Sequence, residues 1–311
     1  MKTLSRIIIV IFIFIDVFLL GKILLAGKNI QVLNPKGIIA LQERDLAFTA
    51  LFLMFIVVIP VFIWAFHVGT TYHENNKRAK YTPDWDHNTK LQFFIWAFPT
   101  AIICLLCVLN WITAHKLDPS DAIASTKKPM IIQVVATRWK WIFIYPEQHI
   151  ATVNLLEFPE QTSIHFELSA SDTPMNSFWI PQLGGQIYAM SGMATQTYLM
   201  ASGVGTYRGA DSEINGAGYA QMVFTVKSVT QNDFNNWVTS VKQSSNSTLD
   251  YATFKKLSQP SQNNPVAYYP STQDDLFNTI VMQYLAHPST SSGQIPAGTS
   301  GNTTSMEGME N

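Results

Sequence analysis

The chain has 311 residues, of which 47% are hydrophobic and 13% charged, and its formal net charge is −1. Soluble domains carry about 25% charged residues, so this composition is typical of a protein with membrane-embedded segments. A near-neutral net charge gives no indication of nucleic-acid binding, and no nucleic-acid partner is expected.

Residues 1–27 combine a basic start with an apolar body, which is the pattern of a secretory signal peptide or of an N-terminal anchor helix. Asp16 interrupts the apolar body, where a carboxylate costs about 2.5–3.5 kcal/mol at the centre of a bilayer. The end of the segment matches the small-x-small cleavage rule poorly. A cleaved signal peptide and a retained anchor helix both remain possible interpretations of residues 1–27. Residues 28–45 are expected to form an exported segment after them.

Two long uncharged runs follow, at residues 46–66 and 91–114. At about 1.5 Å of helix rise per residue, each run spans roughly 30 Å or more, the thickness of a hydrocarbon core. Pro60 and Pro99 lie inside the runs, and transmembrane helices tolerate proline where neighbouring groups satisfy the freed carbonyl. The pattern predicts two transmembrane helices that form a hairpin.

The placement of basic residues predicts the orientation of this hairpin. The loop over residues 67–90 contains three lysines and one arginine, and Lys2 and Arg6 begin the chain. Short loops rich in Lys and Arg stay in the cytoplasm. We therefore expect a cytoplasmic loop at residues 67–90, with residues 115–311 in the periplasm of a bacterial inner membrane.

The two cysteines, Cys104 and Cys107, both lie in the second apolar run. Their spacing places them on one helix face, where small packing residues are the better interpretation than a redox pair. The predicted exported part contains no cysteine, so neither a disulfide nor a thiolate metal site is expected there.

Short alternating runs rich in β-branched and aromatic residues fill residues 125–229 and predict a β-sandwich or barrel. Strands are predicted at residues 131–135, 141–145, 163–168, 195–200 and 221–226. Turn signals between strands are Tyr145-Pro146, Phe158-Pro159, Leu183-Gly184-Gly185, Ser202-Gly203 and Gly216-Ala217-Gly218.

A change of period predicts a helical region over residues 230–287. Thr230 followed by Asp233 is close to a capping box and starts the first helix. A short helix is predicted at residues 249–257, and a third has Leu276, Ile280 and Tyr284 at helical spacing. Residues 288–311 lack the apolar content of a folded segment and are expected to be disordered.

Two motifs in the β region have the frame of a copper site without its usual ligands. They are Asn176-Ser177-Phe178-Trp179-Ile180-Pro181 and Asp211-x-Glu213-x-Asn215-x3-Tyr219-x2-Met222. Both resemble motifs of subunit II of the haem-copper respiratory oxidases. In the cytochrome c oxidases of that family, a histidine in the first motif and Cys-x-Glu-x-Cys-x3-His-x2-Met in the second hold the dinuclear copper A centre.

The resemblance places Asn176, Asp211, Asn215 and Tyr219 at the lost histidine, cysteine, cysteine and histidine positions. Glu213 and Met222 are retained. A copper pair needs soft thiolate and imidazole ligands, so these residues are predicted to hold no metal. We expect Met222 to pack inward and Glu213 to be solvated. Tyr219 is expected to fill the vacated volume.

Further segments resemble the bacterial bo-type ubiquinol oxidases within that family. They are Leu33 to Gly37, Lys80 to His87, Trp139 to Gln148 and Gln186 to Met193, and the resemblance runs from about residue 30 to 287. It implies a membrane α-helical hairpin, an all-β cupredoxin-like sandwich without copper and a C-terminal helical extension. It also implies that haems and copper B belong to a partner subunit I, and that this chain has no cofactor-binding or catalytic residue.

The expected function is that of the non-redox subunit II of a proton-pumping ubiquinol oxidase, which reduces oxygen to water. Cytochrome c delivers electrons from water and needs an exposed relay, whereas quinol reaches subunit I through the bilayer. Trp139 and Trp141 stand at the aromatic motif where cytochrome c oxidases receive electrons, and packing is the better interpretation here. The alternatives are subunit II of an aa-type menaquinol oxidase, or a membrane-anchored cupredoxin-like module outside an oxidase.

Two positions depart from the bo-type pattern. Lys28 stands where the family commonly has a lipidated cysteine, so no lipid anchor is expected. Gln92 stands where the family often has glutamate, so no carboxylate role is expected at the head of the second span.

Overall fold

The computed structural model describes residues 16, 19 and 30–286, apart from 74–75, 77–79, 81–86 and 126. The predicted signal or anchor, Lys28 and the predicted disordered tail therefore lie outside the described residues, except for Asp16 and Leu19.

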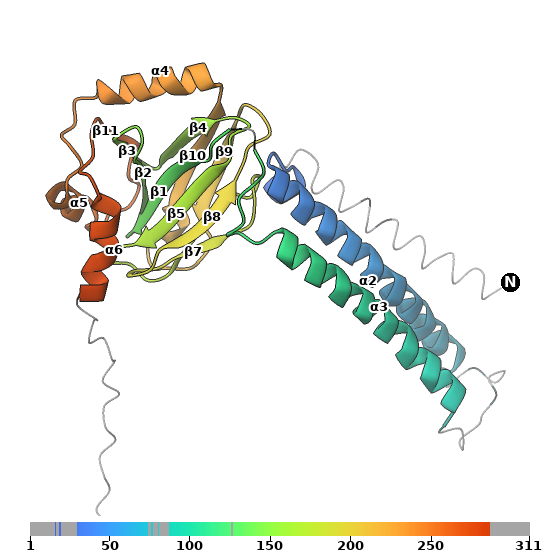
Figure 1. Cartoon of the computed structure of the whole chain (residues 1–311). Helices are drawn as coiled ribbons and strands as arrows, with labels where there is room; N and C mark the ends of the chain where they lie inside the picture. The colour runs from blue at the N-terminus through green and yellow to red at the C-terminus, as the bar shows by residue number, and fades with distance from the viewer. Residues whose placement is uncertain are drawn as a thin grey trace, which may run out of the picture.

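Two long apolar helices, α2 (Ile38–Thr71) and α3 (Thr89–Lys116), are each longer than the predicted span. Figure 1 shows them side by side, extending away from one end of the β-domain. Pro60 and Pro99 lie inside the helices, and Asn88 caps α3 by accepting a hydrogen bond from the Leu91 N–H at 3.1 Å. Their most hydrophobic stretches bury no residue within this chain, so lipid or another protein must cover them.

α2 begins before the predicted membrane span. Residues 38–45, predicted to lie in a segment before the span, already belong to the helix, because nothing after the N-cap Gly37 breaks it. A short 3-10 turn, η1 (Gln31–Leu33), precedes Gly37.

Gly37 anchors this head on the β-domain. The N–H groups of Lys36 and Gly37 donate to the Gln182 carbonyl at 2.7 and 3.0 Å, and the Ala40 N–H donates to the Leu183 carbonyl at 3.1 Å. A Cβ at Gly37 would lie 2.6 Å from the Leu183 carbonyl oxygen, so only glycine fits. The first membrane helix is therefore joined to the β-domain by main-chain bonds.

The β-domain consists of two packed sheets. The six-stranded sheet has the order β11-β3-β2-β1-β5-β8, and the five-stranded sheet has the order β4-β10-β9-β6-β7. The strands are β1 (Met130–Thr137), β2 (Lys140–Tyr145), β3 (Ile150–Val153), β4 (Leu155–Pro159), β5 (Ile164–Ala170), β6 (Asn176–Trp179), β7 (Ile187–Ala189), β8 (Thr195–Leu199), β9 (Gly205–Asp211), β10 (Val223–Val229) and β11 (Ala267–Tyr269). A second 3-10 turn, η2 (Tyr219–Gln221), precedes β10.

An aromatic cluster fills the space between the sheets. Phe178 of the five-stranded sheet stacks on Phe224 at 5.3 Å between ring centroids and meets Trp141 and Phe166 of the other sheet, each at 5.4 Å. Fully burying one such ring contributes about 1.5–3 kcal/mol. The cluster therefore fixes how the two sheets face each other.

All six residues of β2 are buried, because the C-terminal region covers the outer face of its sheet. Trp141 and Phe143 point into the sandwich, whereas Ile142 and Ile144 pack against a second apolar cluster. The buried residues that the C-terminal region contributes to this cluster are Leu249, Phe254, Leu276, Phe277, Ile280 and Val281.

The C-terminal region contains α4 (Gln231–Lys242), α5 (Tyr251–Leu257), β11 and α6 (Leu276–Ala286). Thr230 caps α4 by accepting a hydrogen bond from the Asp233 N–H at 3.2 Å. The short helix predicted from residue 249 begins at Tyr251, because Leu249 instead forms a β-bridge with Thr272.

Lys140 joins this region to the sandwich. Its buried ammonium donates to the carbonyl groups of Leu257 and Gln259 at 2.7 and 2.8 Å and to the Ser261 hydroxyl at 2.6 Å. Burial lowers the pKa of Lys140. The ammonium thus satisfies the carbonyl group of the last residue of α5, which has no partner within the helix, and one carbonyl group of the segment that follows.

Replacing Lys140 with methionine should loosen the C-terminal region. Lys140→Met keeps an apolar stem but removes the ammonium that donates to Leu257, Gln259 and Ser261, which should lower the free energy of unfolding by about 2–3 kcal/mol. Denaturant unfolding of the detergent-solubilised full chain measures this. The matched control is Lys128→Met, at an exposed lysine, and equal effects of the two substitutions would contradict the assignment.

Candidate functional site

Strand pairing brings the two degenerate motifs together. Asn176 opens β6 and Asp211 ends β9, and these strands pair antiparallel with Phe178 opposite Asp211. The loop after Asp211 returns at Met222, whose carbonyl accepts from the Asp211 N–H at 3.0 Å. Asn176 and Asp211 are 35 positions apart in the sequence, but the strand pairing brings both beside the loop between Asp211 and Met222.

The side-chain amide of Asn215 occupies the centre of this site. Its Nδ2 lies 2.5 Å from Asn176 Oδ1, 2.6 Å from Asp211 Oδ2 and 3.2 Å from Met222 Sδ. All four residues are buried. Within the described residues the Asn215 Oδ1 atom has no hydrogen-bond partner. Three of the other five motif residues thus converge on the Asn215 amide nitrogen.

The Asp211 carboxylate is held from both sides. Its Oδ1 accepts from the N–H groups of Ser177 at 2.7 Å and Glu213 at 3.1 Å, while its Oδ2 faces the Asn215 amide. Burial raises the pKa of Asp211, the two N–H donors and the amide oppose that rise, and the charge of Glu213 adds to it. Burial has the largest effect on this pKa, and it raises the pKa because desolvation disfavours the charged form.

A second layer of hydrogen bonds ties the loop to β6 and to the start of β7. The Ser212 hydroxyl donates to Ser177 Oγ at 2.8 Å and contacts Gln186 Oε1. Ser177 Oγ in turn lies 3.1 Å from Gln186 Oε1. Sequence reasoning did not single out these three residues for a role, because only the β6–β9 pairing places them together.

Tyr219 and Glu213 lie at the edge of the site and are half-buried. Tyr219 begins η2, and its side chain forms no hydrogen bond with the described residues. The Asn215 amide lies at the centre of the site, and that Tyr219 fills the volume vacated by metal and ligands stays a prediction.

Trp139 covers the loop from the outside. It lies in the turn between β1 and β2 with φ 116°, and its ring meets the main chain of the loop at Gly216 and Gly218. A Cβ at Gly218 would lie 2.3 Å from the ring, so the loop approaches Trp139 as closely as glycine permits. Trp141 is fully buried in the sandwich core. Both tryptophans therefore pack, as their interpretation from sequence predicted.

Comparison with known proteins assigns the chain to a family. Residues 145–229 match the family model of the cytochrome c oxidase subunit II periplasmic domain, and residues 243–287 match the COX aromatic rich motif. Cytochrome bo(3) ubiquinol oxidase subunit 2 of Pseudomonas putida is 46% identical over 265 residues, covering 85% of this chain and 84% of its own length. The chain belongs to the subunit II family of the ubiquinol oxidases.

A second curated relative agrees with this assignment, and a solved domain is similar to part of the chain. Ubiquinol oxidase subunit 2 of Acetobacter aceti is 44% identical, covering 84% of this chain and 85% of its own length. The solved periplasmic domain of cytochrome oxidase subunit II from Bradyrhizobium japonicum is 22% identical, covering 38% of this chain and 96% of its own, with a TM-score of 0.36. The predicted family and fold class are confirmed, and the chain is a subunit II of a haem-copper oxidase complex.

The side chains around Asn215 do not provide the ligands that a dinuclear copper centre needs. An amide nitrogen that donates hydrogen bonds has no free lone pair for a metal, and its N–H groups face both the Asp211 carboxylate and the Met222 sulfur. One carboxylate and one thioether form a mismatched pair of hard and soft ligands. No cluster of three or more His, Cys, Asp or Glu side chains suited to a metal occurs among the described residues.

The raised pKa of Asp211 predicts a pH-dependent stability. Because the folded state keeps this proton to a higher pH than the unfolded chain, whose carboxyl titrates near 3.8, its contribution to stability is complete below that value and is lost as pH rises through the folded pKa. The variant Asp211→Asn has no carboxyl to titrate. The wild-type free energy of unfolding, minus that of the variant, should therefore decline as pH rises from about 4.

Denaturant titrations of the two full-length proteins in detergent, repeated across this pH range and followed by tryptophan fluorescence, measure that difference. The subtraction removes the contribution of other carboxyls, such as Glu157, whose pKa burial also raises. A difference that stays constant or grows with pH would show that Asp211 is not buried as described.

Proposed function

We propose that this chain is the non-redox subunit II of a proton-pumping ubiquinol oxidase. The haems and copper B would belong to subunit I, and this chain would contribute two membrane helices and a cap on the periplasmic face. The observation that carries the proposal is the Asn215-centred network, because it fills a copper A frame with hydrogen bonds between groups that cannot carry electrons. The match to ubiquinol oxidase relatives supports ubiquinol as the electron donor of the complex.

The membrane arrangement supports this role. Both helices expose apolar side chains along their length, which suits helices that pack on a larger membrane subunit. The basic loop over residues 67–90 favours a cytoplasmic position for the connection between them and a periplasmic sandwich in the bacterial inner membrane. Main-chain bonds at the head of α2 then hold the sandwich directly above its own helix.

The route of the electrons follows from the solubility of ubiquinol in the membrane. Ubiquinol dissolves in the bilayer and can meet the haem subunit there, so a relay in the periplasmic domain would have no task. Trp139 and Trp141 lie at the corresponding entry motif, and both are occupied with packing. In this arrangement electrons do not pass through the chain.

Removing the retained copper-type ligand should leave turnover intact. In purified complex carrying Met222→Leu, quinol-dependent oxygen consumption per haem should stay within about twofold of wild type, because the substitution roughly conserves volume. Oxygen electrode measurements, normalised to haem content, test this. A copper A signal in the electron paramagnetic resonance spectrum of the wild-type complex, or lost turnover in an intact variant complex, would refute the non-redox assignment.

The structural role can be tested at the junction between helix and sandwich. Gly37→Ala forces a Cβ against the Leu183 carbonyl and should reduce the amount of haem subunit that co-purifies with this chain. Gly69→Ala is the matched control on the same helix, because a Cβ there meets nothing within 4 Å. Equal recovery of complex from the two variants, by haem spectra and gel densitometry, would contradict a role of the junction in assembly.

A further inference from the structure

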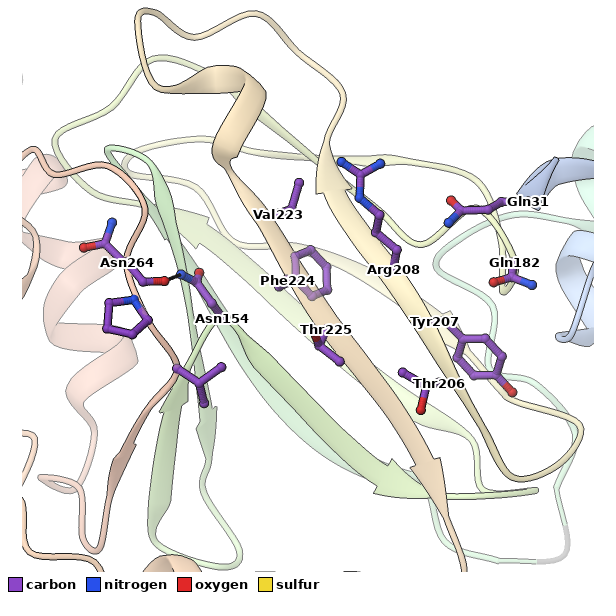
Figure 2. A pocket seen from close by; sticks show the side chains of 12 residues that line it. Gln31, Asn154, Gln182, Thr206, Tyr207, Arg208, Val223, Phe224, Thr225 and Asn264 are labelled. Carbon is purple, nitrogen blue, oxygen red and sulfur yellow. Dashed lines mark hydrogen bonds between the residues drawn. The ribbon is translucent and has the colours of Figure 1, made fainter. Parts of the chain in front are cut away.

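A groove crosses the outer face of the five-stranded sheet at β9 and β10. It consists of two adjoining hollows of about 640 and 400 Å³ that share Gln31 and Arg208 as lining residues. Figure 2 shows the larger hollow, with Arg208 on β9 facing Val223 on one side and Gln31 on the other. We refer to these hollows together as the β9–β10 groove.

The walls of the β9–β10 groove are fixed by internal hydrogen bonds. Asn154 accepts from the Trp141 N–H at 2.9 Å and donates to the Asn264 carbonyl at 3.0 Å. Gln182 donates to the Asn34 carbonyl at 3.2 Å. These walls come from three separate parts of the chain, so the groove is formed before anything binds.

Four side chains in the groove, in contrast, have polar groups without a partner among the described residues. They are Gln31, Thr206, Arg208 and Thr225. Arg208 and Thr225 are direct neighbours across the β9–β10 pair, and Thr206 lies two positions along the same face. Their amide, hydroxyl and guanidinium groups offer both donors and acceptors, as an extended polypeptide requires.

Arg208 is the charge that the surrounding chain leaves unbalanced. Lys227, on the same face of β10, lies directly beside Glu157 of β4 in the parallel pair. Arg208 has no carboxylate within 4 Å among the described residues. A guanidinium pairs in two-pronged fashion with a carboxylate, so the chemistry of the groove selects an acidic occupant.

The position of the groove favours a protein over a lipid headgroup. The apolar run of α2 begins at residue 46, and eight helical residues, about 12 Å, separate it from Gly37 and the preceding η1 turn that lines the groove. A headgroup layer is about 5–7 Å thick on each side of the hydrocarbon core. The groove therefore lies above the headgroups, within reach of a periplasmic segment of a neighbouring subunit.

We propose that the β9–β10 groove holds an extended, carboxylate-bearing periplasmic segment of another subunit of the oxidase, which pairs with Arg208. This proposal rests on the proposed function, because it needs a partner subunit. Val223 and Val266 would contact apolar side chains of that segment, and the free hydroxyl and amide groups would bond its main chain.

The test uses the complex as assembled in membranes. A photo-reactive amino acid replaces Thr225, the complex is purified through a tag on this chain after illumination, and mass spectrometry identifies the cross-linked peptide. The expected result is an adduct with a periplasmic segment of another subunit that contains Asp or Glu. Arg208→Glu should lower the yield of this adduct about fivefold or more, because it replaces attraction by repulsion, whereas Arg208→Lys should largely keep it.

The matched control is Lys242→Glu, which makes the same change of charge at an exposed position on α4 and should leave the adduct unchanged. Adducts only with lipid, with residues 288–311 of this chain or with nothing would overturn the proposal, as would an adduct insensitive to Arg208→Glu. Failure of the haem subunit to co-purify would instead refute the proposed function, so the two failures are distinguishable.

Discussion

The fold depends on the burial of one strand from both sides. In β2 the odd-numbered side chains fill the sandwich, while Ile142 and Ile144 are sealed by the C-terminal helices. The same short stretch supplies Lys140, which holds the end of α5, and is preceded by Trp139, which covers the degenerate copper loop. Core, C-terminal region and site are therefore positioned by a single run of backbone, and none of them can shift without disturbing the others.

Much of this arrangement could be predicted from the sequence where the signal was long or strongly patterned. The two apolar helices and the most clearly alternating strands could be located, and the family resemblance, now confirmed, located the site residues. Short strands were missed. Phe158-Pro159 was predicted as a turn but ends β4. β9, which was not predicted, contains Gly209, where a Cβ would lie 2.0 Å from the Phe224 ring.

The chemistry of the site was harder to foresee than its location. The family resemblance placed Asp211 and Asn215 at the cysteine positions of a copper motif, but a motif carries no information on which side chain takes the centre. Asn215 does so because its two N–H groups can serve several acceptors at once, which the larger Tyr219 cannot. The loop is thus held together by one amide, and its buried carboxylate carries a cost in desolvation.

The bonds around Gly37 have a mechanical consequence. Because the first turn of α2 is hydrogen-bonded into the loops of the sandwich, helix and domain turn as one body. A 34-residue helix is about 51 Å long, so a small change in its tilt swings the sandwich sideways over the membrane surface. A change in the packing that sets the tilt of this helix would in this way be converted into a change in the height and lateral position of the β-domain.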